Sequence, residues 1–89
     1  MRLHHLFDDP AVKAVVAEAE RDAAERFSRL TPRQRQILVM IANGHLNKQS
    51  AHALGISVRT LENHRLQLME RVGARSVSQL IRLTILAGE

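Results

Sequence analysis

The chain has 89 residues, enough for one domain with a small helical core but not for a separate sensory module as well. It contains no cysteine, which excludes disulfides and thiolate metal sites. Its net charge is +4, and eight of its thirteen basic side chains but only three of its nine acidic ones fall within residues 31–89. Such a basic region is typical of a phosphate-binding surface and, equally, of an ordinary solvated face.

No stretch of the sequence resembles a membrane span or a secretion signal. The longest uninterrupted apolar run, Ile37–Ala42, is far shorter than the roughly 20 residues that cross a bilayer. Asp8 and Asp9 stand where a signal peptide would need its apolar segment. We therefore expect a cytoplasmic protein.

A long first helix is predicted from about Asp9 to Arg29, with Asp9 as its cap and Pro10 at its first position. Its apolar residues recur at helical spacing and form one narrow stripe: Val12, Val15, Val16, Ala19, Ala23, Phe27 and Leu30. The stripe could fold back onto the domain or pair with the same helix of a second subunit. A long alanine-rich helix with one apolar seam is poorly stable alone, which favours pairing slightly, through Val15, Val16, Ala19 and Ala23.

The next helix opens with Thr31-Pro32-Arg33-Gln34, in which Thr31 and Gln34 can form a capping box, and Asn43-Gly44 ends it. The segment from residue 46 to residue 65 then has the pattern of two helices joined by a tight turn. Asn47 can cap the first of them, Gly55 stops it in the left-handed backbone region, and Ser57 caps the second. This is the helix-turn-helix pattern, whose second helix enters the major groove of DNA.

The helix starting near Val58 has two different faces. At 100° per residue, Leu61, Leu68 and Val72 fall within a narrow arc that should face the core. The opposite side of the same wheel carries Arg59, Glu62, Asn63 and Leu66. Asn63 could recognise adenine, Leu66 a thymine methyl group, and Arg59 and Arg65 phosphates or a guanine. The alternative is that these are ordinary exposed positions.

A last helix, from about Val77 to Ala87, should be capped by Ser76. Its apolar arc is wider than packing on one small domain requires, which implies a second contact, most simply with the same helix of a symmetry mate. The candidate dimerisation residues on this helix are Val77, Leu80, Ile81 and Thr84. Nothing alternates like a strand, so the sequence predicts an all-α fold.

Other functions find little support in the sequence. His45 and His52 have no cysteine or carboxylate to complete a metal shell, and His4 and His5 are expected to lie in a flexible tail. There is no nucleophile motif, so we expect no catalytic residue and no cofactor. With Phe7 and Phe27 as the only aromatic residues, no platform exists for stacking single-stranded nucleic acid.

Several short motifs, in order along the chain, resemble the LuxR-type output domain, and most closely the branch found in response regulators of the FixJ kind. They are Leu30-Thr31-Pro32-Arg33-Gln34-Arg35-Gln36, Asn43-Gly44, Asn47-Lys48-Gln49, Leu54-Gly55-Ile56-Ser57, Arg59-Thr60-Leu61-Glu62-Asn63-His64-Arg65 and Gly73-Ala74-Arg75-Ser76. The resemblance covers about residues 28–87 and implies a four-helix helix-turn-helix DNA-binding domain of transcription regulators, here preceded by one long N-terminal helix. It implies double-stranded DNA as the partner, dimerisation through the last helix, inverted half-sites, and RNA polymerase as a further candidate partner.

The resemblance also assigns expected roles residue by residue. Positions that contact phosphates in the family are matched by Asn47, Lys48 and Thr60, and groove-facing positions by Glu62 and Asn63. His64 matches the family's histidine near the DNA backbone, and Arg65 the arginine typical of the FixJ branch. We accordingly predict a DNA-binding set of Asn47, Lys48, Arg59, Thr60, Glu62, Asn63, His64, Arg65 and Leu66.

This sequence departs from the family pattern in three ways. Ser50 stands where the family usually has isoleucine in the core, and Leu66 stands at a groove-facing place where a small or basic residue is more usual. The receiver domain of the response regulators is also absent, so the chain is either a single-domain member or part of a longer regulator. We divide it into residues 1–30, a helix for dimerisation or linkage, and residues 31–89, the helix-turn-helix domain.

Two alternative functions remain. Region 4 of a sigma factor shares this architecture and a similar turn, although His64 and the apolar helix after Gly73-Ala74-Arg75-Ser76 fit the LuxR type better. The other alternative is a small antagonist that pairs with a related regulator through its first or last helix and no longer needs DNA.

Overall fold

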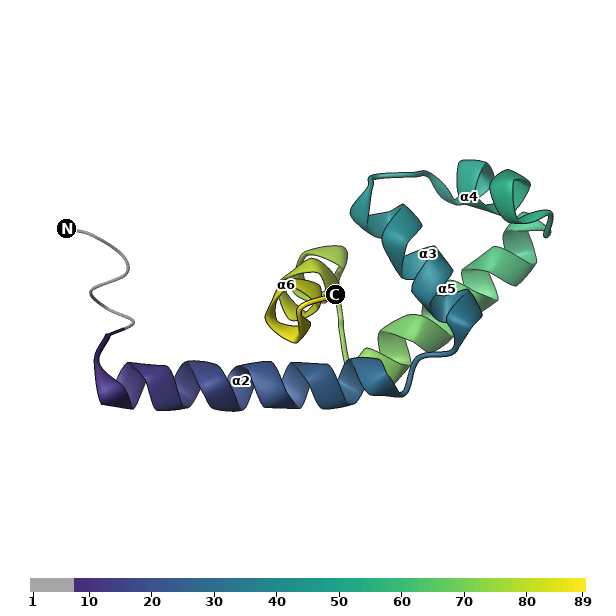
Figure 1. Cartoon of the computed structure of the whole chain (residues 1–89). Helices are drawn as coiled ribbons and strands as arrows, with labels where there is room; N and C mark the ends of the chain where they lie inside the picture. The colour runs from purple at the N-terminus through teal and green to yellow at the C-terminus, as the bar shows by residue number, and fades with distance from the viewer. Residues whose placement is uncertain (1–7) are drawn as a thin grey trace.

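The computed structural model describes residues 8–89, which form helices and connecting loops without any strand. The helices are α2 (Pro10–Ser28), α3 (Pro32–Ala42), α4 (Asn47–Leu54), α5 (Val58–Val72) and α6 (Val77–Ala87) (Figure 1). The predicted all-α class is confirmed. None of these helices has both the length and the apolar character needed to cross a membrane. The predicted tail histidines, His4 and His5, fall outside the described residues.

Local hydrogen bonds cap α2, α3, α5 and α6 at the predicted residues. The Asp9 carboxylate accepts from the backbone N–H of Ala11 at 2.8 Å, and Pro10 begins α2. Before α3, the Thr31 N–H donates to Gln34 Oε1 at 3.0 Å, and the Gln34 N–H donates to Thr31 Oγ1 at 3.1 Å. The predicted capping box is therefore present. Side-chain hydroxyls likewise cap the two later helices, which begin after Ser57 and Ser76.

The prediction that Asn47 caps α4 is wrong. Leu46 occupies the capping position, and its N–H donates to the side-chain Oε1 of Gln49 at 2.9 Å. Asn47 is the first helical residue, and its side chain is engaged by Arg65 of α5 instead. The Asn47 side chain therefore makes a tertiary hydrogen bond with Arg65 instead of the predicted capping bond.

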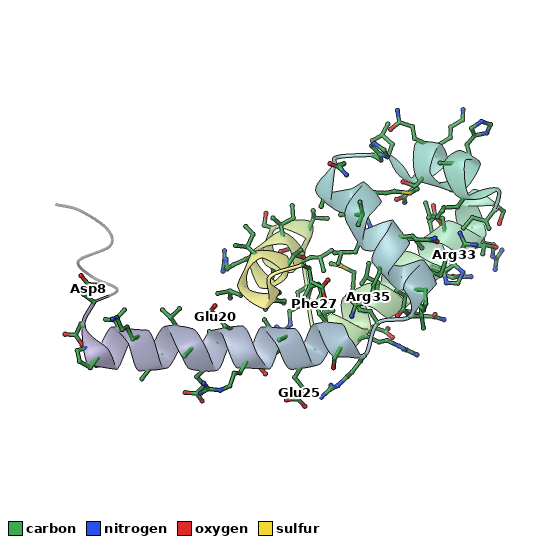
Figure 2. The ribbon with its side chains drawn as sticks, viewed as in Figure 1. Asp8, Glu20, Glu25, Phe27, Arg33 and Arg35 are labelled. Atoms are coloured by element: carbon green, nitrogen blue, oxygen red, sulfur yellow. The ribbon has the colours of Figure 1, made fainter. Side chains whose placement is uncertain are left out.

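The hydrophobic core lies around α5, which contacts α2, α3 and α4. The buried side chains come from every helix of the described chain: Phe27, Leu30, Ile37, Leu38, Ile41, Ala51, Leu61, Leu68, Val72, Ala74 and Leu80. Figure 2 shows Phe27 pointing from α2 towards the other helices, while Glu25 points to the opposite side. The last turn of α2 therefore belongs to the same core as the helix-turn-helix.

The C-terminal part of helix α2 folds back onto the rest of the chain, whereas the sequence slightly favoured pairing with a second subunit. It packs against α6 and α5, and Ala23 and Phe27 are fully buried. Ala23 is thus removed from the set of dimerisation residues, because its side chain has no surface left for a partner. The N-terminal half of α2 projects past the body of the molecule, and Val15 there is 68% exposed (Figure 1).

The wide apolar arc of α6 is explained in part by the same contact. The main contact of α6 within the chain is with α2, which covers one side of the arc. Leu80 is fully buried by this packing and cannot contact a partner, so it too is removed from the dimerisation set. Ile81 and Ile85 remain exposed, at 37% and 73%, and Val77 and Thr84 are half-buried.

Candidate nucleic-acid interface

The outward surface of α5 carries the side chains that the helical wheel placed there. Arg59, Glu62, Asn63 and Leu66 are all exposed, and Leu66 keeps 59% of its surface. The opposite side of α5 is anchored by Leu61, Leu68 and Val72, which are almost completely buried. A helix held so firmly on one side presents the other as a fixed surface, which we call the exposed face of α5 (Arg59, Glu62, Asn63 and Leu66).

A tight turn places α4 against α5. Gly55 ends α4 with φ at +67°, a conformation that glycine adopts at little steric cost, and Ser57 Oγ then accepts from the N–H of Thr60 at 3.0 Å. Ser57 also donates its hydroxyl to Thr60 Oγ1 at 2.9 Å, so the Thr60 hydroxyl proton remains available to an outside acceptor such as a phosphate.

The N-terminus of α4 supplies cationic and donor groups beside α5. Lys48 is exposed at the second position of α4, where the unpaired backbone N–H groups of a helix start add partial positive charge. Asn47 is half-buried and accepts a hydrogen bond at Oδ1 from Arg65 Nη1, at 2.8 Å. His64 is half-buried as well. The predicted residues therefore lie on two helices in contact, α4 and α5, and Figure 1 shows α4 beside the N-terminal part of α5.

Arg65 differs from the other predicted residues. It lies away from the exposed face of α5, half-buried and bonded to Asn47. Sequence patterns did not predict this bond, because periodicity within one helix says nothing about which residue of another helix comes alongside. The architecture of two helices joined by a short turn was the only available signal that the start of α4 lies near the middle of α5.

A further hollow and the titratable side chains of residues 8–89 are the other candidate places for a site. Between α2 and α5, a hollow of about 410 Å³ is lined mainly by charged residues. Four of these form two ion pairs, Arg26 with Asp22 at 3.1 Å and Arg29 with Glu25 at 3.0 Å. No group of three His, Asp or Glu side chains in residues 8–89 is arranged to hold a metal ion. Ser50 is buried, at 4% exposed, as expected for the position where the family has a core residue.

Comparison with known proteins gives a consistent result. The family model described as "Bacterial regulatory proteins, luxR family" matches residues 28–84. The transcriptional regulatory protein FixJ of Azorhizobium caulinodans is 36% identical, over 92% of this chain and 45% of its own length. The tetrathionate response regulatory protein TtrR of Salmonella typhimurium is 39% identical, over 74% of this chain and 32% of its own length.

Among solved structures, full-length FixJ from B. japonicum superposes with a TM-score of 0.75 and 36% sequence identity, over 92% of this chain and 39% of that one. The chain thus spans less than half the length of these relatives.

Proposed function

Because this chain belongs to the luxR family of bacterial regulatory proteins, we propose that it recognises a specific sequence in double-stranded DNA and does so as a dimer on an inverted repeat. The match to the family model confirms the resemblance predicted from the sequence and favours this family over a sigma factor. The members of the luxR family are DNA-binding transcription regulators. The observation that supports the proposal best is the exposed face of α5 beside the cationic start of α4. We propose that α5 docks in the major groove of DNA. We further propose that the protein acts in the cytoplasm and that RNA polymerase is a second partner.

The exposed face of α5 offers groups for base recognition. The Asn63 amide can pair with the N6 and N7 positions of adenine, and the Glu62 carboxylate can accept from the amino group of cytosine. Leu66 is an exposed apolar side chain that suits the methyl group of thymine. Arg59, in the first turn of the helix, can reach a phosphate or a guanine. Because Leu66 departs from the family pattern, the preferred sequence should be this protein's own.

The phosphate contacts would come from the flanks of that face. The groups proposed for these contacts are Lys48 at the start of α4, the Thr60 hydroxyl and the His64 ring on α5. They would contact the DNA backbone that borders the groove. Contacts of this kind position α5 without selecting a sequence, and those from charged side chains make binding sensitive to salt.

A dimer would join two such units so that their α5 helices meet half-sites about one helical turn apart. The surface we propose for this contact consists of side chains on α2 and α6 that keep some exposure. Val15, Ile81 and Ile85 are exposed, and Val16, Ala19, Val77 and Thr84 are half-buried beside them in the sequence pattern. One α5 alone would grip a half-site weakly, so pairing should raise both affinity and selectivity.

Selection of duplexes from a random pool tests base recognition. Wild-type protein should enrich a two-fold symmetric sequence, and Asn63→Ala should lose the preference at one base pair of each half-site, a loss of about 1–3 kcal/mol in discrimination. An Asn63→Ala variant that selects the same sequence as wild type would contradict the role of Asn63. If purified protein binds no duplex but forms a defined complex with a related regulator, the antagonist function is correct instead.

The phosphate role of Lys48 is tested separately by salt dependence. Lys48→Ala should weaken all duplexes alike and flatten the slope of log K against log salt concentration by about 0.9. Lys13→Ala removes the same charge from the exposed surface of α2 and should leave that slope unchanged. A loss confined to particular sequences would contradict the assignment.

A further inference from the structure

The hydrogen bond between Arg65 and Asn47 links the two helices of the DNA-binding unit. Arg65 Nη1 donates to Asn47 Oδ1 at 2.8 Å in partly buried surroundings. Within residues 8–89 it is the only side chain to side chain hydrogen bond that joins α4 to α5. Because one partner is charged and both are partly shielded from water, this bond is stronger than an exposed neutral one.

The bond fixes which way round the Asn47 amide lies. A guanidinium group only donates hydrogen bonds, so it must meet the amide oxygen rather than the amide nitrogen. The –NH₂ group of Asn47 then points away from Arg65. A phosphate oxygen only accepts hydrogen bonds, and the –NH₂ group is the half of the amide that can serve it. The bond to Arg65 therefore uses the accepting half of the amide and leaves the donating half free for a phosphate.

The rest of the α4 packing makes this bond more important. Helix α4 has eight residues. Its buried side chains are those of Ser50 and Ala51, both small, and Leu54 at its far end is partly buried against the core. Small side chains bury little apolar area and leave the angle of a short helix weakly defined. A bond from the first residue of α4 to the middle of α5 restrains the end that carries Asn47 and Lys48.

We propose that Arg65 is a positioning residue for DNA binding, which acts through Asn47 instead of contacting a base or a phosphate itself. It orients the Asn47 amide towards a phosphate and holds the start of α4 at a fixed angle to α5. This inference rests on the proposed function, and it replaces the direct phosphate or guanine contact that the sequence predicts for Arg65.

A double-mutant cycle on DNA affinity tests the inference. The probe is a duplex carrying the sequence that wild-type protein selects from a random pool, and the variants are Asn47→Ala, Arg65→Ala and the pair together. Each single variant should weaken binding about tenfold, the size of one hydrogen bond to a charged group. The double variant should bind no more weakly than either single variant, since both remove the same contact.

Salt dependence separates this role from a direct phosphate contact by Arg65. The slope of log K against log salt should be the same for Arg65→Ala as for Asn47→Ala. Losses that multiply in the double variant, or a slope for Arg65→Ala that is flatter than that of Asn47→Ala by about 0.9, would overturn the inference. A wild-type protein that binds no duplex would overturn the proposed function together with it, which is a distinguishable result.

Asn47→Asp gives an independent test that preserves the fold. The carboxylate still accepts from Arg65, so the melting temperature should not fall, but it can no longer donate to a phosphate and it adds a negative charge. DNA affinity should fall at least as far as in Asn47→Ala. Gln79→Glu is the matched control, because its side chain keeps its bond from the Arg75 N–H, 2.8 Å long, and adds the same charge on α6. Wild-type affinity in Asn47→Asp would refute the inference.

Discussion

Gly73 at the end of α5 is restricted by its backbone and by its neighbour. Its φ is +69°, and a Cβ added there would lie 2.8 Å from Arg26 Nη1. That Nη1 atom is itself fixed, because it donates to the carbonyl oxygen of Val72 at 3.0 Å. The Arg26 side chain must shift to make room for a methyl group, and the shift would strain this hydrogen bond. Gly55 has nearly the same φ, +67°, but open space around its Cα.

The pair of glycines gives a matched prediction. Gly55→Ala should lower the free energy of unfolding by about 1–2 kcal/mol, the cost of a left-handed backbone for a residue with a Cβ. Gly73→Ala should lose about 1 kcal/mol more, because it also strains the Arg26 hydrogen bond. Denaturant unfolding measures both values. In an Arg26→Ala background the extra loss at Gly73 should disappear; equal losses for the two glycines in the wild-type background would contradict the steric argument.

Residues were predicted best where their hydrogen bonds are local. Thr31, Gln34 and Ser57 bond to groups only three residues away, so their roles follow from neighbouring sequence. Asn47 was assigned wrongly because its partner, Arg65, is 18 residues away and on another helix. The exposed positions of α5 were placed correctly by periodicity, but which bases they contact depends on DNA geometry that no helical wheel contains.

At the scale of elements, arginines connect the C-terminal ends of α2 and α5. Arg26 of α2 donates to the last carbonyl of α5, and Arg71 of α5 donates to the carbonyl of Arg29, just after α2, at 2.9 Å. Arg35 of α3 donates to the carbonyl of Phe27 at 2.8 Å. The last carbonyls of a helix lack partners within it and carry partial negative charge. Each end is thus satisfied by a cation from another helix, which ties α2 to α3 and α5.

Removing these arginines should loosen α2 without altering α4. Arg26→Ala should lower the free energy of unfolding by about 1 kcal/mol, because the lost bond is only partly shielded. Arg71→Ala should cost less, since its bond is exposed. Amide hydrogen exchange should rise in the last turn of α2 in both variants and stay unchanged in α4.

Arg21→Ala is the control for this prediction, because Arg21 is exposed on α2 and makes no hydrogen bond within residues 8–89. It should leave exchange in α2 as in wild type. Faster exchange spread equally over α4 would show that the arginines stabilise the whole fold rather than the attachment of α2.

The helices themselves were predictable because caps, glycines and apolar periodicity are recorded in each segment separately. The partner that covers an apolar stripe cannot be predicted from that segment alone. The apolar pattern of α2 is compatible with packing inside the chain and with packing on a second subunit. The loop after Ser28 decides between them, because it turns the chain so that Phe27 and Leu30 lie in the core. The large Phe27 side chain at the end of the stripe is fully buried, so this part of α2 must pack against the core.

At the scale of the whole molecule, the net charge is uneven: residues 1–30 carry −1 and residues 31–89 carry +5. The projecting half of α2 lies on the far side of the molecule from α4, as Figure 1 shows. Residues 1–30 hold six acidic and five basic side chains, whereas residues 31–89 hold three acidic and eight basic ones, among them Lys48 and Arg59 of the helix-turn-helix. A duplex approaching α4 and α5 would therefore meet positive charge first, while the acidic part of α2 stays distant from the phosphates.

The apolar side chains left exposed by this arrangement support a contact between two copies of the chain. Val15 on α2 and Ile85 on α6 are 68% and 73% exposed. Because neither contributes to the core, replacing them should not change the stability of a single chain, so their effect on association can be measured cleanly. Introducing a charge into an apolar contact surface is costly, since the charge loses its hydration without gaining a partner.

Val15→Glu and Ile85→Glu should each raise the dissociation constant of the proposed dimer at least about tenfold, as a desolvated, unpaired charge would. Sedimentation equilibrium measures that constant. Both variants should bind an inverted repeat more weakly than wild type does, but a duplex with a single half-site equally well, because α5 is untouched. Ala24→Glu is the control: Ala24 is exposed on α2 and, at about 100° per residue, lies on the side opposite Val15. If neither variant dissociates the dimer while wild type is dimeric, the two chains meet through another surface.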